Sequence, residues 1–375
     1  MCLNLLHIIP SLDSACGGPS RSVPLLCAWL VRSKSTKVRI VTAVIPTQGG
    51  GVPVSEVSLR DLRTRAVLDA SADALHHVHA LWNPFSTLAM RSLRRAKYPY
   101  VLSLRGMLRP ETIGSRKKRF WARMWERANV AGAAAVHVTS ADELEATRAC
   151  GWRLPPVALI PNPVEIPEFC HTVYSDGPVR LNGRPSILYV GRLSGIKRLD
   201  LLLRAFALVH KQAVNAELIF AGPDSEGILH ELKRTARQQG IAHRVTFLGM
   251  QTQAQLGTLF RQASVAALVS QRENFGMAAA EAMAHGVPVV LTKHVGVARE
   301  AEEAGGAIVV DDSPESIADG LLTMLNDYGR SQLMSRRARA LVEQRYSPPR
   351  VAEMMLSVYK WVLGQGPQPD CVRVN

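Results

Sequence analysis

The stretch SVAALVSQRENFGMAAAEAMAHGVPVVLT, residues 264–292, contains a complete strand–helix–strand pattern. The apolar run at 264–270 predicts a buried strand, and VPVVLT at 287–292 predicts another. Between them, the alanine-rich segment is composed of strong helix formers and is stopped by Gly286 and Pro288. Two apolar strands joined by a helix are typical of a parallel sheet in an α/β fold.

The same alternation of apolar runs and amphipathic segments continues through the rest of the chain. In the first part, strands are predicted at 3–9, 38–44, 75–81, 100–104, 134–140 and 157–162. In the second part, they are predicted at 186–191, 216–222, 244–249, 264–270, 287–292 and 307–310. Two α/β, Rossmann-like domains in tandem explain this pattern, and no short-period repeat competes with it.

The domain boundaries are expected where proline interrupts the alternation. Four prolines fall between residues 156 and 167, and a polar, glycine-containing stretch follows. Such a composition is typical of an interdomain linker. The expected divisions are an N-terminal domain (1–165), a linker (166–185), a C-terminal domain (186–346), a helix returning to the N-terminal domain (347–364) and a frayed tail (365–375).

Positive charge is concentrated in the first half of the chain. The formal net charge is +14; residues 1–170 hold 22 Lys and Arg against 12 Asp and Glu, whereas the remaining 205 residues hold 23 against 19. This asymmetry indicates that the N-terminal part meets an anionic molecule, which could be nucleic acid, acidic lipid headgroups or a phosphorylated substrate. The alternative is a basic surface that serves solubility alone.

The cysteines and the N-terminal segment indicate in which cellular compartment the protein is expected. The six cysteines form no CxxC pair and have no nearby histidine at metal-ligand spacing, as is usual for reduced thiols of a cytosolic protein. The start, MCLNLLHIIP, lacks a basic flank and a cleavage site. No apolar run approaches the roughly 18 residues of a membrane span. We therefore expect a cytoplasmic protein.

Two carboxylates flank the start of the helix in the opening stretch. Glu273 lies in the loop before this helix, whereas Glu281 lies inside it, and we expect Asn274 to cap the helix. The backbone N–H groups at 276–278 then form a positive helix end that suits a diphosphate. Eight helical residues span about 12 Å, more than the roughly 5 to 9.5 Å of a glycoside hydrolase pair. Two contacts on one elongated ligand fit better, although each glutamate alone could be merely exposed.

A second motif with charged residues at a strand end is LYVGRLSGIKRLDLLLRAFALV, residues 188–209. A strand ends at Gly191, Arg192 follows, and Lys197 precedes a helix that begins near Leu199. Two cations around a tight turn at the carboxyl end of a strand can neutralise a leaving diphosphate. The alternative is a basic turn facing solvent.

Together the two motifs resemble the retaining glycosyltransferases of family GT4, which have the GT-B fold. The family patterns are a GRL-x-x-x-K turn and an E-x7-E motif written E-G-F-G-x-x-x-x-E-A-M-A-x-G-x-P-V. Here the E-x7-E match consists of Glu273, Phe275, Gly276, Glu281, Ala282, Met283, Gly286 and Pro288, with Asn274 in place of the common glycine. The resemblance is close over the C-terminal half of the chain and loose over the N-terminal half.

The resemblance implies two Rossmann-like domains facing across a cleft and a role for each motif residue. Arg192 and Lys197 would hold the donor diphosphate, which makes them catalytic together with Glu273 on the donor sugar. Glu281 would bind the ribose. Donor contacts are also implied for Asn274, Phe275, Gly276 and Met277. No metal or other cofactor is expected, since the sequence offers no DxD-type site.

The N-terminal half offers weaker candidates. The loop SLDSACGGPSRSV, residues 11–23, resembles the glycine-rich loop of the family and implies that Gly17 and Gly18 lie near the donor phosphate. Many relatives have a histidine after the strand at 100–104, where this chain has Arg105 instead. Arg105 and His79 are expected close to the sugar or acceptor. His77 and His79 share one face of a strand, and a core role is as compatible with them as a catalytic one.

The segment SRKKRFWARMWERANV, residues 115–130, is basic and aromatic at helical spacing. At an anionic membrane it would dock the enzyme beside a lipid-linked acceptor. The alternative is an amphipathic helix that packs on its own domain.

These observations and the resemblance predict a glycosyltransferase, and the resemblance alone implies that it retains the anomeric configuration. Its partners would be a UDP- or GDP-linked sugar and a glycan or lipid-linked glycan acceptor. The expected setting is bacterial surface polysaccharide or lipopolysaccharide synthesis, at the inner face of the plasma membrane. A nucleotide-sugar epimerase of the same fold is the first alternative. A basic nucleic-acid-binding protein is the second, and it is weakened because the basic residues are not interleaved with stacking aromatics.

Overall fold

The computed structural model describes residues 2–13, 17–33, 35–44, 52–64, 68, 73–168 and 183–373. The chain divides into two compact units. Unit 1 comprises Met1–Pro163 and Pro348–Asn375, and unit 2 comprises Val164–Ser347. Most of the expected linker over 166–185 lies outside the described residues. The expectation of two α/β domains of the GT-B class is confirmed.

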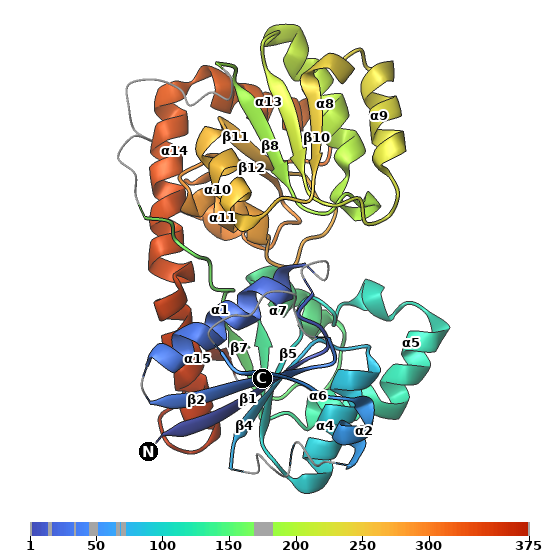
Figure 1. Cartoon of the computed structure of the whole chain (residues 1–375), viewed down its shortest axis with the longest axis vertical. Coiled ribbons are helices and arrows are strands. Elements are labelled where there is room, and N and C mark those ends of the chain that lie inside the picture. Colours follow the sequence, from blue (N-terminus) through green and yellow to red (C-terminus); the bar gives the residue numbers. More distant parts are fainter. Residues whose placement is uncertain are drawn as a thin grey trace. The chain divides into compact units, whose positions relative to one another are not determined.

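Unit 1 is built on a mainly parallel sheet (Figure 1). Among the described residues the strand order is β14-β7-β6-β5-β4-β1-β2-β3. The strands are β1 (Leu3–Ile9), β2 (Thr36–Thr42), β3 (Val54–Glu56), β4 (Leu75–His79), β5 (Tyr100–Ser103), β6 (Ala135–Val138), β7 (Val157–Leu159) and β14 (Val372–Arg373). Only β14 pairs antiparallel, with β7. The expected frayed tail is therefore wrong in part, because Val372 is buried against the sheet.

Helices cover both faces of this sheet, which is why its central strands are buried on both sides. The helical elements of unit 1 are α1 (Gly18–Arg32), α2 (Leu59–Thr64), α4 (Pro84–Ala96), η2 (Pro110–Ile113), α5 (Arg116–Trp121), η3 (Ala122–Glu126), α6 (Arg127–Ala131), α7 (Ala141–Ala149) and α15 (Pro348–Val362). Figure 1 shows α15 beside α1, and both helices contribute to one core cluster. The last long helix of the chain thus completes the core of the first unit.

Unit 2 has a parallel sheet with the order β10-β9-β8-β11-β12-β13 within the described residues. Its strands are β8 (Ser186–Val190), β9 (Glu217–Ala221), β10 (Val245–Gly249), β11 (Val265–Leu268), β12 (Val289–Thr292) and β13 (Ala307–Val310). Its helical elements are η5 (Gly195–Lys197), α8 (Leu199–Gln212), α9 (Leu229–Gln238), η6 (Ala242–Arg244), α10 (Gln253–Gln262), α11 (Met277–Ala284), α12 (Ala298–Glu303), α13 (Pro314–Asn326), α14 (Tyr328–Leu341) and η7 (Val342–Tyr346).

All twelve strands predicted from apolar runs are present, with ends that differ by a few residues. The two that the sequence did not predict, β3 and β14, are short strands at the edges of the unit 1 sheet. In both units, the loops that follow the carboxyl ends of the parallel strands lie along one edge of the sheet. That edge is where open α/β sheets bind ligands.

Candidate functional site

In unit 2, a tight turn follows β8 at the carboxyl edge of the sheet. Gly191 has φ 151°, and a Cβ on the neighbouring Gly222 would lie 2.0 Å from the Gly191 carbonyl oxygen. The η5 turn then ends at Lys197, and α8 begins at Leu199, as predicted. The side chain of Arg192 is exposed at this edge. The glycines thus allow two backbone segments to approach closely beside the two cations.

The loop after β11 is held by backbone pairing to the loop after β12. The N–H of Glu273 donates to the carbonyl of His294 at 2.9 Å, and the N–H of Gly296 donates to the carbonyl of Glu273 at 2.9 Å. A Cβ on Gly296 would lie 2.0 Å from the Asn274 carbonyl oxygen. Only glycine therefore fits at residue 296, which the sequence analysis did not identify. Its signal in the sequence is a glycine flanked by valines after a predicted strand.

Helix α11 begins one turn after Glu273, but Asn274 does not cap it. The N-cap is Gly276, whose φ of 97° is a left-handed conformation that favours glycine. No side chain caps this end and no acidic residue lies in its first turn. The prediction of Asn274 as the cap is therefore wrong, because the 273–275 segment is extended against the 294–297 loop. The backbone N–H groups of the first turn are left for a ligand or solvent.

Lys197 and Glu273 meet although 76 residues separate them in the sequence. The Lys197 ammonium forms an ion pair with the Glu273 carboxylate. The side chains are 13% and 23% exposed, so a ligand can still reach the pair. Burial, followed by the positive charge of Arg192, lowers the pKa of Lys197 to about 8. The turn and the loop are also joined by the N–H of Gln271, which donates to the Ile196 carbonyl at 2.9 Å.

Glu281 is the fifth residue of α11 and is 6% exposed, so it is not a solvated surface glutamate. Phe275 is buried and packs edge-to-face on Tyr346, with ring centroids 5.3 Å apart. Met277 is half-buried in the first turn. The structure thus assembles the predicted residues of both motifs within one unit. It adds Ser194, whose buried hydroxyl has no hydrogen-bond partner among the described residues.

In unit 1, Gly17 precedes α1 with φ 86°, and Gly18 is the first residue of the helix. Residues 14–16 of the glycine-rich loop lie outside the described residues. His79 is fully buried at the end of β4, and Arg105 follows β5 with φ 56°. The guanidinium Nη2 of Arg105 lies 3.3 Å from His79 Nδ1. His79 and Arg105 belong to unit 1, whereas the residues of the two motifs belong to unit 2.

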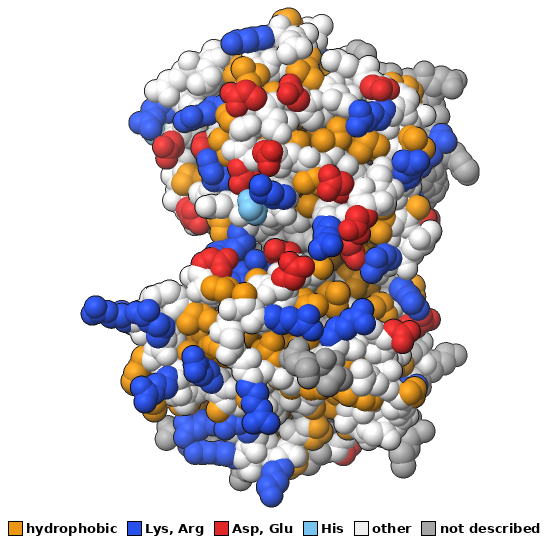
Figure 2. Space-filling view, turned by 180° about the vertical axis from the view of Figure 1, so that it is seen from behind, with side chains coloured by type: hydrophobic (Ala, Val, Ile, Leu, Met, Phe, Trp, Pro, Cys, Tyr) orange, Lys and Arg blue, Asp and Glu red, His pale blue; other side chains and the backbone are white. Residues whose placement is uncertain are grey.

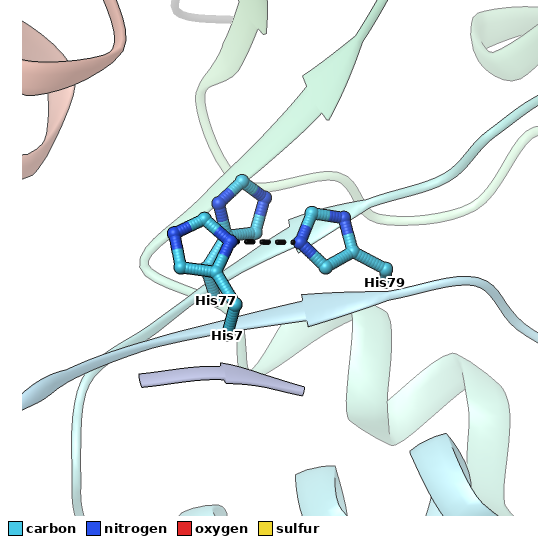
Figure 3. A group of neighbouring side chains, drawn as sticks. All are labelled: His7, His77 and His79. Carbon is cyan, nitrogen blue, oxygen red and sulfur yellow. Dashed lines mark hydrogen bonds between the residues drawn. The ribbon is translucent and has the colours of Figure 1, made fainter. Parts of the chain in front are cut away.

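Three histidines of unit 1 lie close enough to raise the question of a metal (Figure 3). One ring nitrogen from each of His7, His77 and His79 lies within 4.8 Å of the others, and all three residues are buried. This is the cluster of possible metal ligands among the described residues. Both nitrogens of His77 already have hydrogen-bond partners, and the neighbouring charge is the cation Arg105. The donor set therefore fits a hydrogen-bonded network better than a divalent cation.

Comparisons with known proteins agree with this description. Residues 176–341 match the model of the glycosyl transferases group 1, and residues 17–163 match the glycosyl transferase 4-like domain. A D-inositol 3-phosphate glycosyltransferase of Nocardia farcinica is 34% identical over 187 residues, which are 48% of this chain and 41% of the relative. The chain also spans less than two-thirds of the length of several other curated relatives that it matches.

Two solved structures show the same fold at low sequence identity. Sucrose-phosphate synthase from Thermosynechococcus elongatus superposes with a TM-score of 0.75 and 18% identity, over 96% of this chain and 99% of that chain. Anabaena HepE in complex with UDP-glucose superposes with a TM-score of 0.74 and 19% identity, over 96% and 100%.

Proposed function

We propose that this chain, which belongs to the group 1 glycosyltransferases, transfers a glycosyl group from a nucleotide-sugar donor to a glycan acceptor. The observation that carries the proposal is the ion pair of Lys197 and Glu273 beside the uncapped start of α11. Anion-binding and hydroxyl-binding groups meet there at the carboxyl edge of a parallel sheet. The similarity to a protein solved with UDP-glucose supports a uridine donor.

The donor roles follow from charge and position. Arg192 and Lys197 neutralise the diphosphate, and the N–H groups at the start of α11 donate to its oxygens. Glu273 accepts hydrogen bonds from the hydroxyl groups of the sugar, and it also holds Lys197 in place. Glu281 accepts from the ribose hydroxyls. Small residues around the helix start allow a close approach of the ligand.

The chemistry is a displacement at the anomeric carbon with retention of configuration. The bond between this carbon and the diphosphate oxygen breaks, and the acceptor oxygen forms the new bond on the same face. The acceptor proton passes to the departing phosphate. The protein contributes positioning and positive charge, which Arg192 and Lys197 supply without a metal ion.

The acceptor is proposed to be lipid-linked, on the evidence of a surface of unit 1. One side of the helical segment α5–η3–α6 packs on its own domain through the buried Glu126, as one of the two readings of the sequence expects. The other side exposes Phe120 (63%) and Met124 (52%). The face of unit 1 visible in Figure 2 carries many Lys and Arg and few Asp and Glu side chains. Exposed apolar and basic groups together are typical of binding to an anionic membrane.

Membrane binding is tested by co-sedimentation with two kinds of vesicle. One contains phosphatidylcholine alone, and the other contains phosphatidylcholine with ~30% of the anionic lipid phosphatidylglycerol. We expect binding to the anionic vesicles that a Phe120→Ser/Met124→Ser double variant loses. The matched control is Val214→Ser in unit 2, where the valine is 59% exposed. Equal binding of the double variant and the wild type would contradict this role. No helix among the described residues is long and apolar enough to cross a membrane.

The transferase activity is tested by product analysis with a panel of UDP- and GDP-sugars. We expect nucleoside diphosphate release that depends on a glycan acceptor, and a product linkage that keeps the anomeric configuration in its NMR spectrum. Glu273→Gln should lower the turnover more than the affinity for the donor. An isomerised nucleotide sugar formed without any acceptor would instead identify an epimerase and contradict the proposal.

A further inference from the structure

Buried polar side chains form a row across one face of the unit 1 sheet. His7, His77 and His137 lie on β1, β4 and β6, and Ser103 lies on β5 between the last two. Backbone pairing aligns His7 with His77 and Ser103 with His137. All four are at most 2% exposed. Buried polar groups need hydrogen-bond partners, so this row demands an explanation.

The direction of the hydrogen bonds is fixed at one end by Arg105, which can only donate. Its Nη2 lies 3.3 Å from His79 Nδ1, which must therefore accept. A neutral imidazole has one donor and one acceptor. His79 thus carries its proton on Nε2 and donates to His7 Nδ1 at 3.1 Å, the contact drawn in Figure 3. His7 in turn presents Nε2–H to the Tyr359 hydroxyl at 3.5 Å.

The same direction continues to the other end of the row. The Tyr359 hydroxyl donates to His77 Nδ1 at 2.5 Å, and His77 Nε2 donates to Ser103 Oγ at 2.7 Å. Ser103 Oγ donates to His137 Nδ1 at 2.6 Å, and His137 Nε2 donates to the Ile160 carbonyl at 2.8 Å. The last group can only accept, which agrees with the direction set by Arg105. The four histidines of this hydrogen-bonded network, His7, His77, His79 and His137, therefore take the Nε2–H tautomer.

Burial keeps the four histidines of the network neutral. Burial, with the positive charge of Arg105 as a further cause, lowers the pKa of His7 and His137 to about 3. The pKa of His77 and His79 is also held well below its usual value, again mainly by burial. Arg105 is thus the charged member of an otherwise neutral network.

The Arg105 guanidinium is a desolvated cation whose hydrogen-bond partners among the described residues are neutral. It donates to Asn162 Oδ1, to Ser22 Oγ at 3.3 Å and to His79, and its buried Nε has no partner among the described residues. Burial lowers the pKa of Arg105 to about 10. The negative charge of Glu143 acts against this shift and raises the pKa of Arg105, but its carboxylate accepts a hydrogen bond from the N–H of Gly106. A buried cation without an anionic contact favours binding of an anion.

The position of Arg105 suits a ligand. Arg105 follows β5, His79 ends β4 and Asn162 follows β7, so all three lie at the carboxyl edge of the parallel sheet. The Arg105 backbone is left-handed, with φ 56°, which costs about 1 kcal/mol for a residue other than glycine. Arg105 as a whole residue is half-buried, whereas its Nε atom is buried. A strained, directed cation at a ligand-binding edge is typical of a functional site.

We propose that Arg105 is the centre of an oxyanion-binding site of unit 1, which takes a phosphate or carboxylate group of the acceptor. His79 is its positioning residue, because its Nδ1 lone pair and the chain of hydrogen bonds behind it fix the plane of the guanidinium. The assignment of the anion to the acceptor rests on the proposed function. Binding of an oxyanion at Arg105 stands without it.

The binding test is a calorimetric titration of the full-length protein with inorganic phosphate and with acetate, at saturating UDP so that phosphate sites in unit 2 are occupied. We expect Arg105→Ala to weaken binding at least ~10-fold, as for loss of hydrogen bonds to a charged group. Arg95→Ala, which removes an exposed guanidinium from the same unit, should change nothing. Phosphate binding that Arg105→Ala leaves unchanged would overturn the proposal.

Positioning by His79 is tested by a matched pair of variants. His79→Asn keeps an acceptor near the position of Nδ1 and should restore most of the affinity, whereas His79→Leu should bind phosphate several-fold more weakly. An unchanged tryptophan fluorescence spectrum shows that unit 1 of a variant is folded, because all six tryptophans belong to this unit. Equal affinity of the two variants would contradict the positioning role. If UDP does not bind but phosphate binding still depends on Arg105, the proposed donor site is contradicted, whereas the proposed oxyanion site at Arg105 is supported.

The direction of the hydrogen bonds in the network is tested by ¹⁵N–¹H NMR of histidine-labelled protein at neutral pH. We expect the Nε2–H tautomer for His7, His77, His79 and His137. An Nδ1–H tautomer at any of the four histidines would contradict the proposed direction of the hydrogen bonds. Stoichiometric binding of Zn²⁺ that is lost in His7→Asn would identify a metal site instead and would also overturn the proposal.

Discussion

Lys197 is the residue at which the donor site responds to pH. Its ammonium contacts Glu273, and its pKa of about 8 results from burial and from the charge of Arg192. The sequence analysis placed both residues at the donor because of motif resemblance. It did not predict their ion pair, because residues 76 positions apart meet only through the order of β8 and β11.

Raising the pH from 7 to 9 should weaken UDP binding about tenfold, because the Lys197 ammonium loses its proton as the pH rises through about 8. Lys197→Arg keeps the charge over this range and should show little change. Calorimetry at pH 7, 8 and 9 measures both proteins. A wild-type affinity that stays constant across the range would show that Lys197 does not bind the diphosphate.

At the scale of the element, the start of α11 depends on two glycines. The sequence predicted the helix and its end, because local composition determines both. It assigned the wrong N-cap, because the conformation of Gly276 is set by pairing with a loop some 20 residues further along the chain. Backbone pairing over such a distance leaves no local signal.

Gly276→Ala should destabilise unit 2 by about 2–4 kcal/mol, since a left-handed φ of 97° is combined with a Cβ that would lie 2.6 Å from Val295 Cγ1. The matched control is Gly240→Ala, with φ 72° and no atom within 4 Å of the added Cβ. This control should cost about 1–2 kcal/mol, from the backbone alone. Urea unfolding followed by circular dichroism compares the two variants, and equal costs would refute the role of the Val295 contact.

At the scale of the whole molecule, the two units can be observed separately. All six tryptophans, at 29, 82, 121, 125, 152 and 361, belong to unit 1. Tryptophan fluorescence therefore reports the unfolding of this unit. The buried histidines of its sheet make the same unit sensitive to acid.

The stability of unit 1 should fall as the pH drops below about 6.5. The unfolded histidines then take up protons, whereas folded His7 and His137 stay neutral down to a pKa of about 3. Each such histidine contributes a loss of about 1.4 kcal/mol per pH unit. Urea unfolding at pH 6.5 and 5.5, followed by tryptophan fluorescence, measures this slope. His137→Gln should reduce it, and His230→Gln, on the exposed side of unit 2, should not; an unchanged slope in His137→Gln would contradict the account.

The same network shows what the sequence could not predict in unit 1. Alternation within 75–81 was enough to place His77 and His79 on one face. The hydrogen bond from Tyr359 to His77 joins residues 282 positions apart, and it exists only because α15 returns to the first unit. Which strands are neighbours, and therefore which polar residues share a row, depends on topology that apolar periodicity does not encode.

The measurement that tests the central claim most directly is calorimetric titration of UDP and GDP into the wild type, Glu281→Gln and Glu303→Gln. Glu281 is buried inside α11, whereas Glu303 is an exposed glutamate of α12. We predict that the wild type and Glu303→Gln bind a nucleoside diphosphate equally, and that Glu281→Gln binds it about 10-fold more weakly. If neither nucleotide binds the wild type, or if folded Glu281→Gln binds as tightly as the wild type, the proposed donor site is contradicted.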